Sequence, residues 1–337
     1  MSKLIIPGSY QPILSVYETQ RAIGDIKRIF EQKLSSALNL MRVSAPLFVE
    51  SGSGLNDDLN GIERPVEFDL LETGSYAQIV QSLAKWKRIA LHKYGIPVGE
   101  GLYTDMNAVR RDEEMDNLHS IYVDQWDWEK VIDRTERNIE YLKETVEKIV
   151  GAICDTEEEI GKRYLDGKAA ARLCRVVSFV TSQELEDMYP ELSPKERENE
   201  YVKKHRTAFI MQIGGLLRSG IRHDGRAPDY DDWTLNGDIL FWNELLECAF
   251  EISSMGIRVD EKALDGQLTM AGCDNRRNLP YHKQLLGGGL PLAIGGGIGQ
   301  SRLCMLFLKK AHIGEVQSSI WDKDTLSGCE STGIKLL

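Results

Sequence analysis

Apolar side chains recur at helical spacing in three long segments of the chain. In residues 16–38 the apolar positions are Ile23, Ile26, Phe30, Leu34 and Leu38. This spacing predicts an amphipathic helix at the start of the fold. A second helical pattern, YAQIVQSLAKWKRIALHKYG, ends at Gly95. A third runs from Glu129 to Arg163 and is rich in charges; its apolar positions are Val131, Ile139, Leu142, Val146, Ile149 and Ile153. It predicts a long helix that packs one face on the core.

Strand-like patterns occupy most of the remaining chain. The segment LNLMRVSAPLFVE is apolar but contains Pro46, which favours an edge strand. GEGLYTDMNAVRRDEE and HSIYVDQWDWE flank the polar turn MDN and predict an antiparallel hairpin. Further strands are predicted in AFIMQIGG, GDILFWN and AFEISSMGIRVD. Because no helix of crossover length separates these later strands, the pattern favours an antiparallel α+β sheet over a doubly wound parallel one.

Composition and charge narrow the function classes. The chain has 337 residues, 42% hydrophobic and 28% charged, and contains no internal repeat or linker, so we expect one domain over residues 1–337. It has neither an apolar run of membrane-spanning length nor a signal-peptide pattern, so we expect a cytoplasmic protein with no membrane partner. A net charge of −11 argues against a nucleic-acid partner. The six cysteines form no CxxC pair, which predicts free thiols.

The densest glycine cluster lies in LPLAIGGGIGQSRLCMLFLKK. It is not a dinucleotide fingerprint, because Gln300 stands where the last glycine should be, and no Gly-Lys-Ser/Thr phosphate loop exists in the chain. Consecutive glycines allow a backbone or a flat ring to approach closely, and Arg302 follows near a helix N-terminus that favours anions. Two interpretations remain open on these residues alone: a nucleotide phosphate site, or tight packing of a helix on a sheet.

Three other segments concentrate functional groups. On the second hairpin strand, Gln125 and Asp127 share one face, which suits the ammonium group of an amino acid. The segment IRHDGRAPDYDDW is dense in both charge signs and is either an exposed ion-pair cluster or part of a site. Glu251 lies between apolar neighbours, so it faces outward or has a partner, because an unpaired buried carboxylate is costly.

These motifs, in this order, resemble a known family. Pro46 after an apolar strand, RRDEE followed by HSIYVDQWDWE, and GGGIGQSRL are similar to the three motifs of class II aminoacyl-tRNA synthetase catalytic domains. SLAKWKR, GEGLYT, RAPDYDDW, NGDI, SSMGIRV and IGGGIGQSR further resemble ammonia-dependent asparagine synthetase, the aspartate–ammonia ligase related to aspartyl-tRNA synthetase. The resemblance covers nearly the whole chain. It implies a class II synthetase-like antiparallel sheet flanked by helices, and a homodimer formed through the opening helix and the Pro46 strand.

The resemblance also implies a reaction. The side-chain carboxylate of L-aspartate attacks the α-phosphorus of ATP, giving β-aspartyl-AMP and pyrophosphate, and ammonia then displaces AMP to give L-asparagine. Mg²⁺ is the implied cofactor. Glutamine is not expected as the nitrogen donor, because residue 2 is Ser, the first cysteine is Cys154, and no cysteine has a recognisable partner histidine.

Roles for individual residues follow from the resemblance as expectations. The catalytic residues are Arg110 on the α-phosphate, Arg302 on the γ-phosphate end, and Asp57, in the loop SGSGLNDDLNG, beside the incoming ammonia. The aspartate site is expected to contain Lys87, Gln125, Asp127, Asp231, Ser254 and Arg258. The nucleotide site adds Ser120, Arg226, Asp238, Gly297 and Gly299 to the two catalytic arginines. Asp238 and Glu251 are the expected Mg²⁺ ligands, because Mg²⁺ prefers oxygen donors.

One departure and two alternatives qualify this hypothesis. Arg258 stands where aspartyl-tRNA synthetases typically carry a second acidic metal ligand, so their metal geometry is not transferred. The first alternative is a tRNA synthetase-like paralogue with another acceptor; the acidic charge and the lack of residues for an anticodon domain count against it. The second is a non-catalytic sensor of aspartate or adenylate, which would not need both arginines and Lys87.

Overall fold

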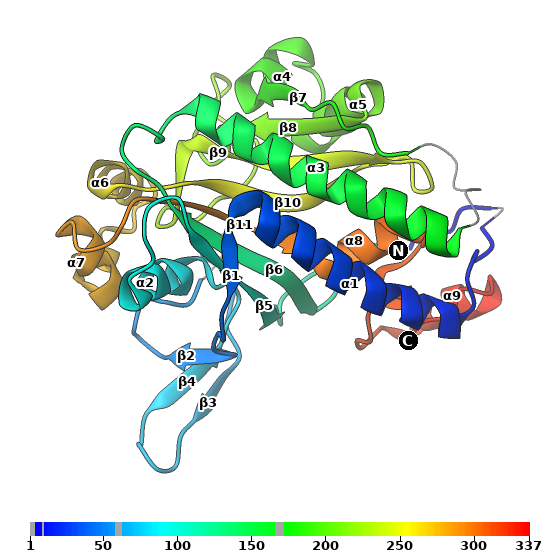
Figure 1. Cartoon of the computed structure of the whole chain (residues 1–337), viewed down its shortest axis with the longest axis horizontal. Coiled ribbons are helices and arrows are strands. Elements are labelled where there is room, and N and C mark those ends of the chain that lie inside the picture. The colour runs from blue at the N-terminus through cyan, green and yellow to red at the C-terminus, as the bar shows by residue number, and fades with distance from the viewer. Residues whose placement is uncertain (1–3, 9, 58–62, 166–171) are drawn as a thin grey trace.

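An eight-stranded sheet forms the centre of the computed structural model, which describes residues 4–8, 10–57, 63–165 and 172–337 (Figure 1). Its strands, in spatial order, are β1 (Leu40–Arg42), β5 (Gly101–Val109), β6 (Tyr122–Val131), β11 (Ala293–Gly299), β10 (Cys248–Arg258), β9 (Asp231–Asn243), β8 (Thr207–Met211) and β7 (Ser178–Thr181). The predicted α+β sheet flanked by helices is present. The chain's own strand pattern also predicted the β5–β6 hairpin, which is present.

The sheet is antiparallel except at its two edges. There β1 pairs with β5, and β7 with β8, in parallel. The reason at one edge is a helical connection that the sequence pattern did not reveal: α4 (Ser182–Met188) and α5 (Pro194–His205) lie between β7 and β8. A connection of this length allows two neighbouring strands to run in the same direction.

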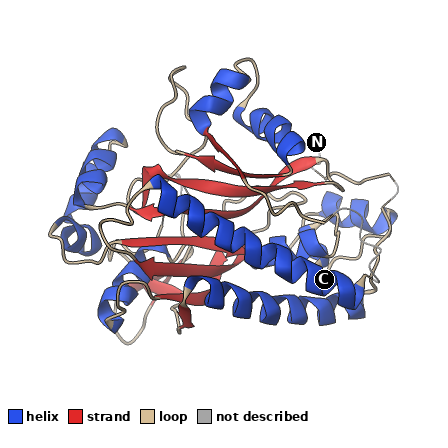
Figure 2. Ribbon diagram, turned by 45° about the horizontal axis from the view of Figure 1, so that its top comes forward, coloured by secondary structure: helices blue, strands red, loops and turns tan. Residues whose placement is uncertain are grey.

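Two long helices lie side by side across one face of the sheet (Figures 1 and 2). The first, α1 (Val16–Leu38), has the predicted bounds: a capping box of Ser15 and Glu18 begins it, and Asn39 ends it in the left-handed conformation. The second, α3 (Ile139–Tyr164), begins ten residues later than its predicted start at Glu129. That prediction was wrong because residues 129–131 complete β6 and pair with β5 and β11, and the side chain of Asn138 caps the helix.

The region around Pro46 is divided between two sheets. Pro46 separates β1 from β2 (Phe48–Glu50), which joins β4 (Tyr76–Ile79) and β3 (Glu67–Asp69) in a three-stranded sheet that projects from the body (Figure 1). The second predicted helix is therefore shorter than its pattern: α2 spans Ala84–Tyr94, and Gly95 ends it as predicted, with φ of 63°. The predicted loop at 51–61 lies partly outside the described residues.

The C-terminal part of the chain contributes β11 and several short helices. The glycines at 295–299 lie inside β11 rather than in a loop, and α8 (Gln300–Phe307) follows directly. The remaining elements are α6 (Glu261–Met270), the 3₁₀ helix η1 (Asp274–Asn278), α7 (Pro280–Leu286), the 3₁₀ helix η2 (Ile313–Glu315) and α9 (Lys323–Ser331). Within the described ranges, no helix has the length and apolar character needed to cross a membrane.

Candidate active site

Side chains of β6 point alternately to the two faces of the sheet, so one set packs in the core and the other lines a polar cavity. Trp126 and Trp128 are fully buried, and Trp126 packs on Phe30 of α1 with ring centroids 4.7 Å apart. Successive strand residues point to opposite faces, so Gln125 and Asp127 point away from α1. They line a cavity of about 350 Å³ on the other face of the sheet.

This cavity brings together nearly all of the predicted site residues. Its lining includes Asp57, Lys87, Arg110, Ser120, Gln125, Asp127, Arg226, Asp231, Glu251, Ser254, Arg258, Gly297, Gly299 and Arg302. These residues come from β6, β9, β10, β11, α2, α8 and three loops. Of the predicted residues, Asp238 does not line the cavity. The lining is therefore assembled from segments far apart in the chain.

One end of the cavity is a buried network of paired charges. Lys87 Nζ lies 3.0 Å from Asp127 Oδ2 and donates to the carbonyl oxygen of Gly296, also at 3.0 Å. Arg258 donates to Glu129 at 2.7 Å and to Asp231. Burial lowers the pKa of Lys87, and the Asp127 carboxylate opposes that effect. We call the five charged side chains of this group the charged network; every member has a partner before any substrate binds.

The glycines of β11 make room for this end of the cavity. In the β6–β11 register, Gly297 stands opposite Asp127 and Gly295 opposite Glu129. A Cβ atom at Gly297 would lie 2.5 Å from Gln125 Oε1 and 2.7 Å from Asp127 Oδ1. The space above Gly297 is thus filled by the polar side chains of β6. Gly299 instead lies beside the Arg302 side chain, and its contact with adenine stays a prediction.

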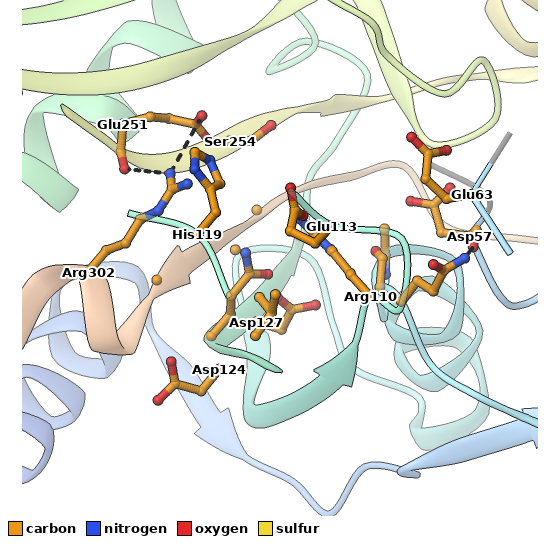
Figure 3. Close-up of a pocket in the computed structure, with 18 of the residues that line it drawn as sticks. Asp57, Glu63, Arg110, Glu113, His119, Asp124, Asp127, Glu251, Ser254 and Arg302 are labelled. Carbon is orange, nitrogen blue, oxygen red and sulfur yellow. Dashed lines mark hydrogen bonds and ion pairs between the residues drawn. The ribbon is translucent and has the colours of Figure 1, made fainter. Parts of the chain in front are cut away.

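The other end of the cavity carries two arginines with weaker partners. Arg110 follows β5, lies 3.8 Å from the Glu113 carboxylate, and has a buried Nε that meets no acceptor among the described residues. Arg302, in the first turn of α8, donates to the Glu251 carbonyl oxygen at 2.9 Å, and its guanidinium is 3.7 Å from the Glu251 carboxylate. Figure 3 shows Arg302 beside Glu251 and His119, and Arg110 farther along the cavity near Glu113. We call the part of the cavity that holds these two weakly paired side chains the arginine end.

Of the two predicted metal ligands, only one lines the cavity. Glu251 lines the cavity, whereas both carboxylate oxygens of Asp238 accept from Arg226, at 2.7 and 2.8 Å. Asp238, paired with Arg226, is thus not among the lining residues, and its contact with the nucleotide stays a prediction. Burial raises the pKa of Asp238 to about 7, with Arg226 opposing and Glu251 adding to the shift. The cations Arg302 and Lys195 hold the pKa of Glu251 below its ordinary value against the effect of burial.

A magnesium ion would need additional ligands here. No group of three or more His, Cys, Asp or Glu side chains able to hold a metal occurs in the described part of the chain. Asp238 and Glu251 are on neighbouring strands, and Glu251 is close enough to raise the pKa of Asp238. The donor set fits Mg²⁺ only if phosphate oxygens and waters complete its octahedron, as is usual for Mg²⁺ bound with nucleotides.

Sequence reasoning missed several residues of the cavity. His119, Glu113, Tyr230 and Asp124 line it, and so does Gln317, which lies beyond α8. Gln317 Nε2 donates to Asp124 Oδ1 and to Ser301 Oγ, both at 3.1 Å, and its Oε1 lies 2.5 Å from Ser120 Oγ. Gln317 therefore fixes the predicted Ser120 in place. Only spatial proximity reveals it, because it belongs to no motif.

The fold and the site define a class of protein. The mainly antiparallel sheet flanked by helices is, as predicted, a class II aminoacyl-tRNA synthetase-like fold, and its cavity is lined by an arginine after β5, glycines of β11 and an arginine at the start of α8. The asparaginyl-tRNA synthetase of Entamoeba histolytica, in complex with asparaginyl-adenylate, matches with a TM-score of 0.65 at 14% identity, over 90% of this chain and 66% of that chain. That of Pyrococcus horikoshii matches with a TM-score of 0.63 at 16% identity, over 89% and 68%. These likenesses show the fold.

Sequence similarity identifies the family within this class. The aspartate–ammonia ligase family model matches residues 17–333. The aspartate–ammonia ligase of Clostridium perfringens strain 13 is 60% identical over the full length of both chains. That of Bacillus cereus strain B4264 is 58% identical over 97% of this chain and 99% of the relative. The chain belongs to the aspartate–ammonia ligase family, and the predicted ligase function is confirmed.

Proposed function

We propose that this ligase converts L-aspartate and ammonia to L-asparagine through a β-aspartyl-AMP intermediate, with release of pyrophosphate and AMP. The observation that carries the proposal is the contrast between the two ends of the cavity. The charged network offers fixed, buried groups of both signs, which suit a zwitterionic amino acid. The arginine end offers guanidinium groups with weak partners, which suit a polyphosphate.

At the amino-acid end, the ammonium group of aspartate is held by Gln125 and Asp127, and its α-carboxylate by Lys87. Asp127 and Lys87 already lie 3.0 Å apart, so both groups are placed for one small zwitterion. Asp231, Ser254 and Arg258 complete the pocket from β9 and β10. The side-chain carboxylate of the substrate then extends toward Arg110.

At the arginine end, Arg110 neutralises charge on the α-phosphate and on the attacking carboxylate. Arg302 binds the γ-phosphate end, and Ser120 and Gly299 border the nucleotide. Fixed donors of this kind stabilise the charge that develops in the transition state, which is commonly the main source of rate acceleration in such a step.

Asp57 lies at the edge of the cavity, where it orients the incoming ammonia. Asp238 and Glu251 would hold Mg²⁺, with Arg226 released from Asp238; when bound, the ion supplies further neutralisation of phosphate charge.

Two further features belong to the proposal. Met41, Leu47 and Phe48 are exposed around Pro46 in the single chain, which supports a homodimer through this region and α1. The net charge of −11 supports small-molecule partners rather than nucleic acid, with the cytoplasm as the location.

The test follows the products. Purified protein is incubated with L-aspartate, ATP and Mg²⁺, with either ammonium or glutamine, and AMP, ADP, pyrophosphate and asparagine are measured. We expect AMP, pyrophosphate and asparagine in equal amounts with ammonium. Without ammonium, we expect only aspartate-dependent exchange of labelled pyrophosphate into ATP. Formation of ADP, or activity with glutamine alone, contradicts the proposal.

A further inference from the structure

A second cavity, of about 230 Å³, adjoins the proposed active site. It lies between residues 52–57 and the segment from η1 to α7. Asp57 lines both cavities, and its carbonyl oxygen accepts from Gln81 Nε2 at 2.7 Å. Tyr230 lines the first cavity while its chain neighbour Asp229 lines the second. The two cavities therefore meet at Asp57 and along this short segment of the chain.

Asp229 is the buried centre of the second cavity's wall. Its carboxylate, which has no solvent exposure, lies 3.4 Å from Lys85 Nζ, 2.9 Å from Arg276 Nη1 and 3.0 Å from His282 Nε2. Burial alone would raise the pKa of Asp229, but Lys85, His282 and Arg276 hold it well below its ordinary value. The carboxylate is therefore ionised and only accepts hydrogen bonds, so His282 Nε2 is the donor. A neutral imidazole that carries its proton on Nε2 has a lone pair on Nδ1, so Nδ1 is then a hydrogen-bond acceptor.

His282 Nδ1 lies close to the segment around Gly54 that lines the second cavity. The side chain is fully buried, and a Cβ atom built on Gly54, which lines the cavity, would lie 3.5 Å from Nδ1. No donor reaches Nδ1 from the described residues, and the same holds for Asp229 Oδ1. Asp229 and His282 both line the second cavity, and each has a buried acceptor that no described donor reaches, which costs energy unless a donor binds.

The charges around the second cavity favour a small cationic donor. Among the described residues, its lining contains the carboxylates of Glu50, Asp57 and Asp229 and the cations Lys85 and Arg276, which gives one excess negative charge. Ammonium carries four N–H donors and no acceptor, so it complements two unpartnered acceptors and a net negative wall. Asp57 lines both cavities, so the second cavity borders Asp57 from outside the cavity proposed for β-aspartyl-AMP.

We propose that the second cavity binds ammonium, and that His282 Nδ1 accepts one proton from it, so that ammonia reaches the acyl-adenylate past Asp57. This inference rests on the proposed function. Ammonium gives one proton to Nδ1, and the nitrogen lone pair forms the C–N bond to the β-carbonyl carbon. The C–O bond to the phosphate breaks, with its electron pair leaving on AMP, and the nitrogen gives a second proton to the Asp57 carboxylate.

The experiment compares His282→Gln with a matched control, His223→Gln. His223 is also buried, its Nε2 lies 3.1 Å from the Glu198 carboxylate, its Nδ1 has no donor among the described residues, and it lines neither cavity. Each variant is assayed for aspartate-dependent pyrophosphate exchange, for asparagine formation across ammonium concentrations, and for aspartyl hydroxamate formation with hydroxylamine. Hydroxylamine is a weak base that is largely unprotonated at neutral pH, so it needs no proton acceptor before it attacks.

We expect His282→Gln to lower kcat/KM for ammonium by about a hundredfold, a typical loss for a proton acceptor. Pyrophosphate exchange should stay within about threefold of the wild-type rate, and hydroxamate formation should fall less than asparagine formation. His223→Gln should leave all three readouts near wild type. An unchanged kcat/KM for ammonium in His282→Gln would overturn the proposal, since a bound water would then satisfy Nδ1. An equal loss of exchange and amidation would also overturn it, because His282 would then be a structural residue of the whole site.

A second variant covers the case in which His282→Gln does not fold. Leu279→Trp places bulk in the second cavity without removing any of its charges. We expect a rise of at least tenfold in KM for ammonium with exchange near wild type, and an unchanged KM overturns the proposal. A wild-type protein that makes no asparagine from ammonium at all would instead refute the proposed function, which separates the two failures.

Discussion

The two ends of the active-site cavity differ in how their charges are compensated. In the charged network, the side chains of Arg258, Glu129 and Asp231 are at most 3% exposed, and each has an ion-pair partner within the protein. At the arginine end, the side chain of Arg110 is 26% exposed and that of Arg302 is 21% exposed, and their carboxylate partners lie 3.7–3.8 Å away. The charges of the charged network are therefore compensated within the protein, whereas those of Arg110 and Arg302 are compensated only in part.

This difference indicates how each substrate is recognised. Buried pairs fix the position of every donor and acceptor before binding, so the amino-acid end selects a zwitterion of one size with little rearrangement. Weakly paired arginines keep uncompensated positive charge, which becomes effective only when phosphate groups displace water. We infer that substitutions in the charged network act mainly on stability and on aspartate binding, whereas substitutions at the arginine end act mainly on the adenylation step.

The largest expected effect is on folding. Arg258→Met leaves Glu129 and Asp231 buried without their guanidinium partner, so we expect the free energy of unfolding to fall by about 3–5 kcal/mol. Urea denaturation followed by circular dichroism measures it. The control is Arg218→Met, which removes an exposed arginine from its pair with Asp187 and should cost under about 1 kcal/mol. Similar losses of unfolding free energy in the two variants would show that the buried ion pairs of the charged network contribute no more to stability than an exposed pair.

The next largest expected effect is that of a substitution at Arg110, which should slow catalysis without preventing folding. Arg110→Ala should slow aspartate-dependent pyrophosphate exchange by about 10²–10³-fold, because a fixed donor to the transition state is lost. Its unfolding free energy should change by less than about 1 kcal/mol, since the pair with Glu113 is loose and partly exposed. Arg111→Ala is the matched control: its side chain is exposed and lines neither cavity. Near-normal exchange in Arg110→Ala would remove Arg110 from the reaction.

The sequence predicted the parts of this comparison that depend on local pattern. Strand alternation placed Gln125 and Asp127 on one face of β6, and the structure has them there, in one cavity. The bounds of α1 followed from its apolar spacing, and the structure adds the Ser15 cap at its start. The β5–β6 hairpin followed from two alternating segments around a polar turn. In each of these cases the information lies within a short stretch of neighbouring residues.

Features that depend on distant residues were not predictable from the pattern. The helical spacing at Val131 favoured an early start for α3, but pairing with β5 and β11 places that residue in a strand. Asp238, a predicted metal ligand, is paired with Arg226 and does not line the cavity, and no spacing rule reports such a contact. Gln317 and His282 lie in no motif, and only the folded chain shows the side chains that they face.

The smallest expected effect tests the interpretation of the glycines. Gly297→Ala adds a methyl group 2.5 Å from Gln125 Oε1 and 2.7 Å from Asp127 Oδ1, so both side chains must shift. Overpacking of this kind costs about 1–3 kcal/mol. We expect that cost as a rise in KM for aspartate of about tenfold, with KM for ATP nearly unchanged.

Gly299→Ala provides the contrast, because its added methyl group would meet only the Arg302 side chain, at 3.2 Å from Cβ. It should raise KM for ATP modestly and leave KM for aspartate near wild type. If Gly297→Ala instead raises KM for ATP, both glycines border the adenine ring, as the sequence motif suggested. The boundary between the charged network and the arginine end would then lie closer to β6, and β11 would belong wholly to the nucleotide site.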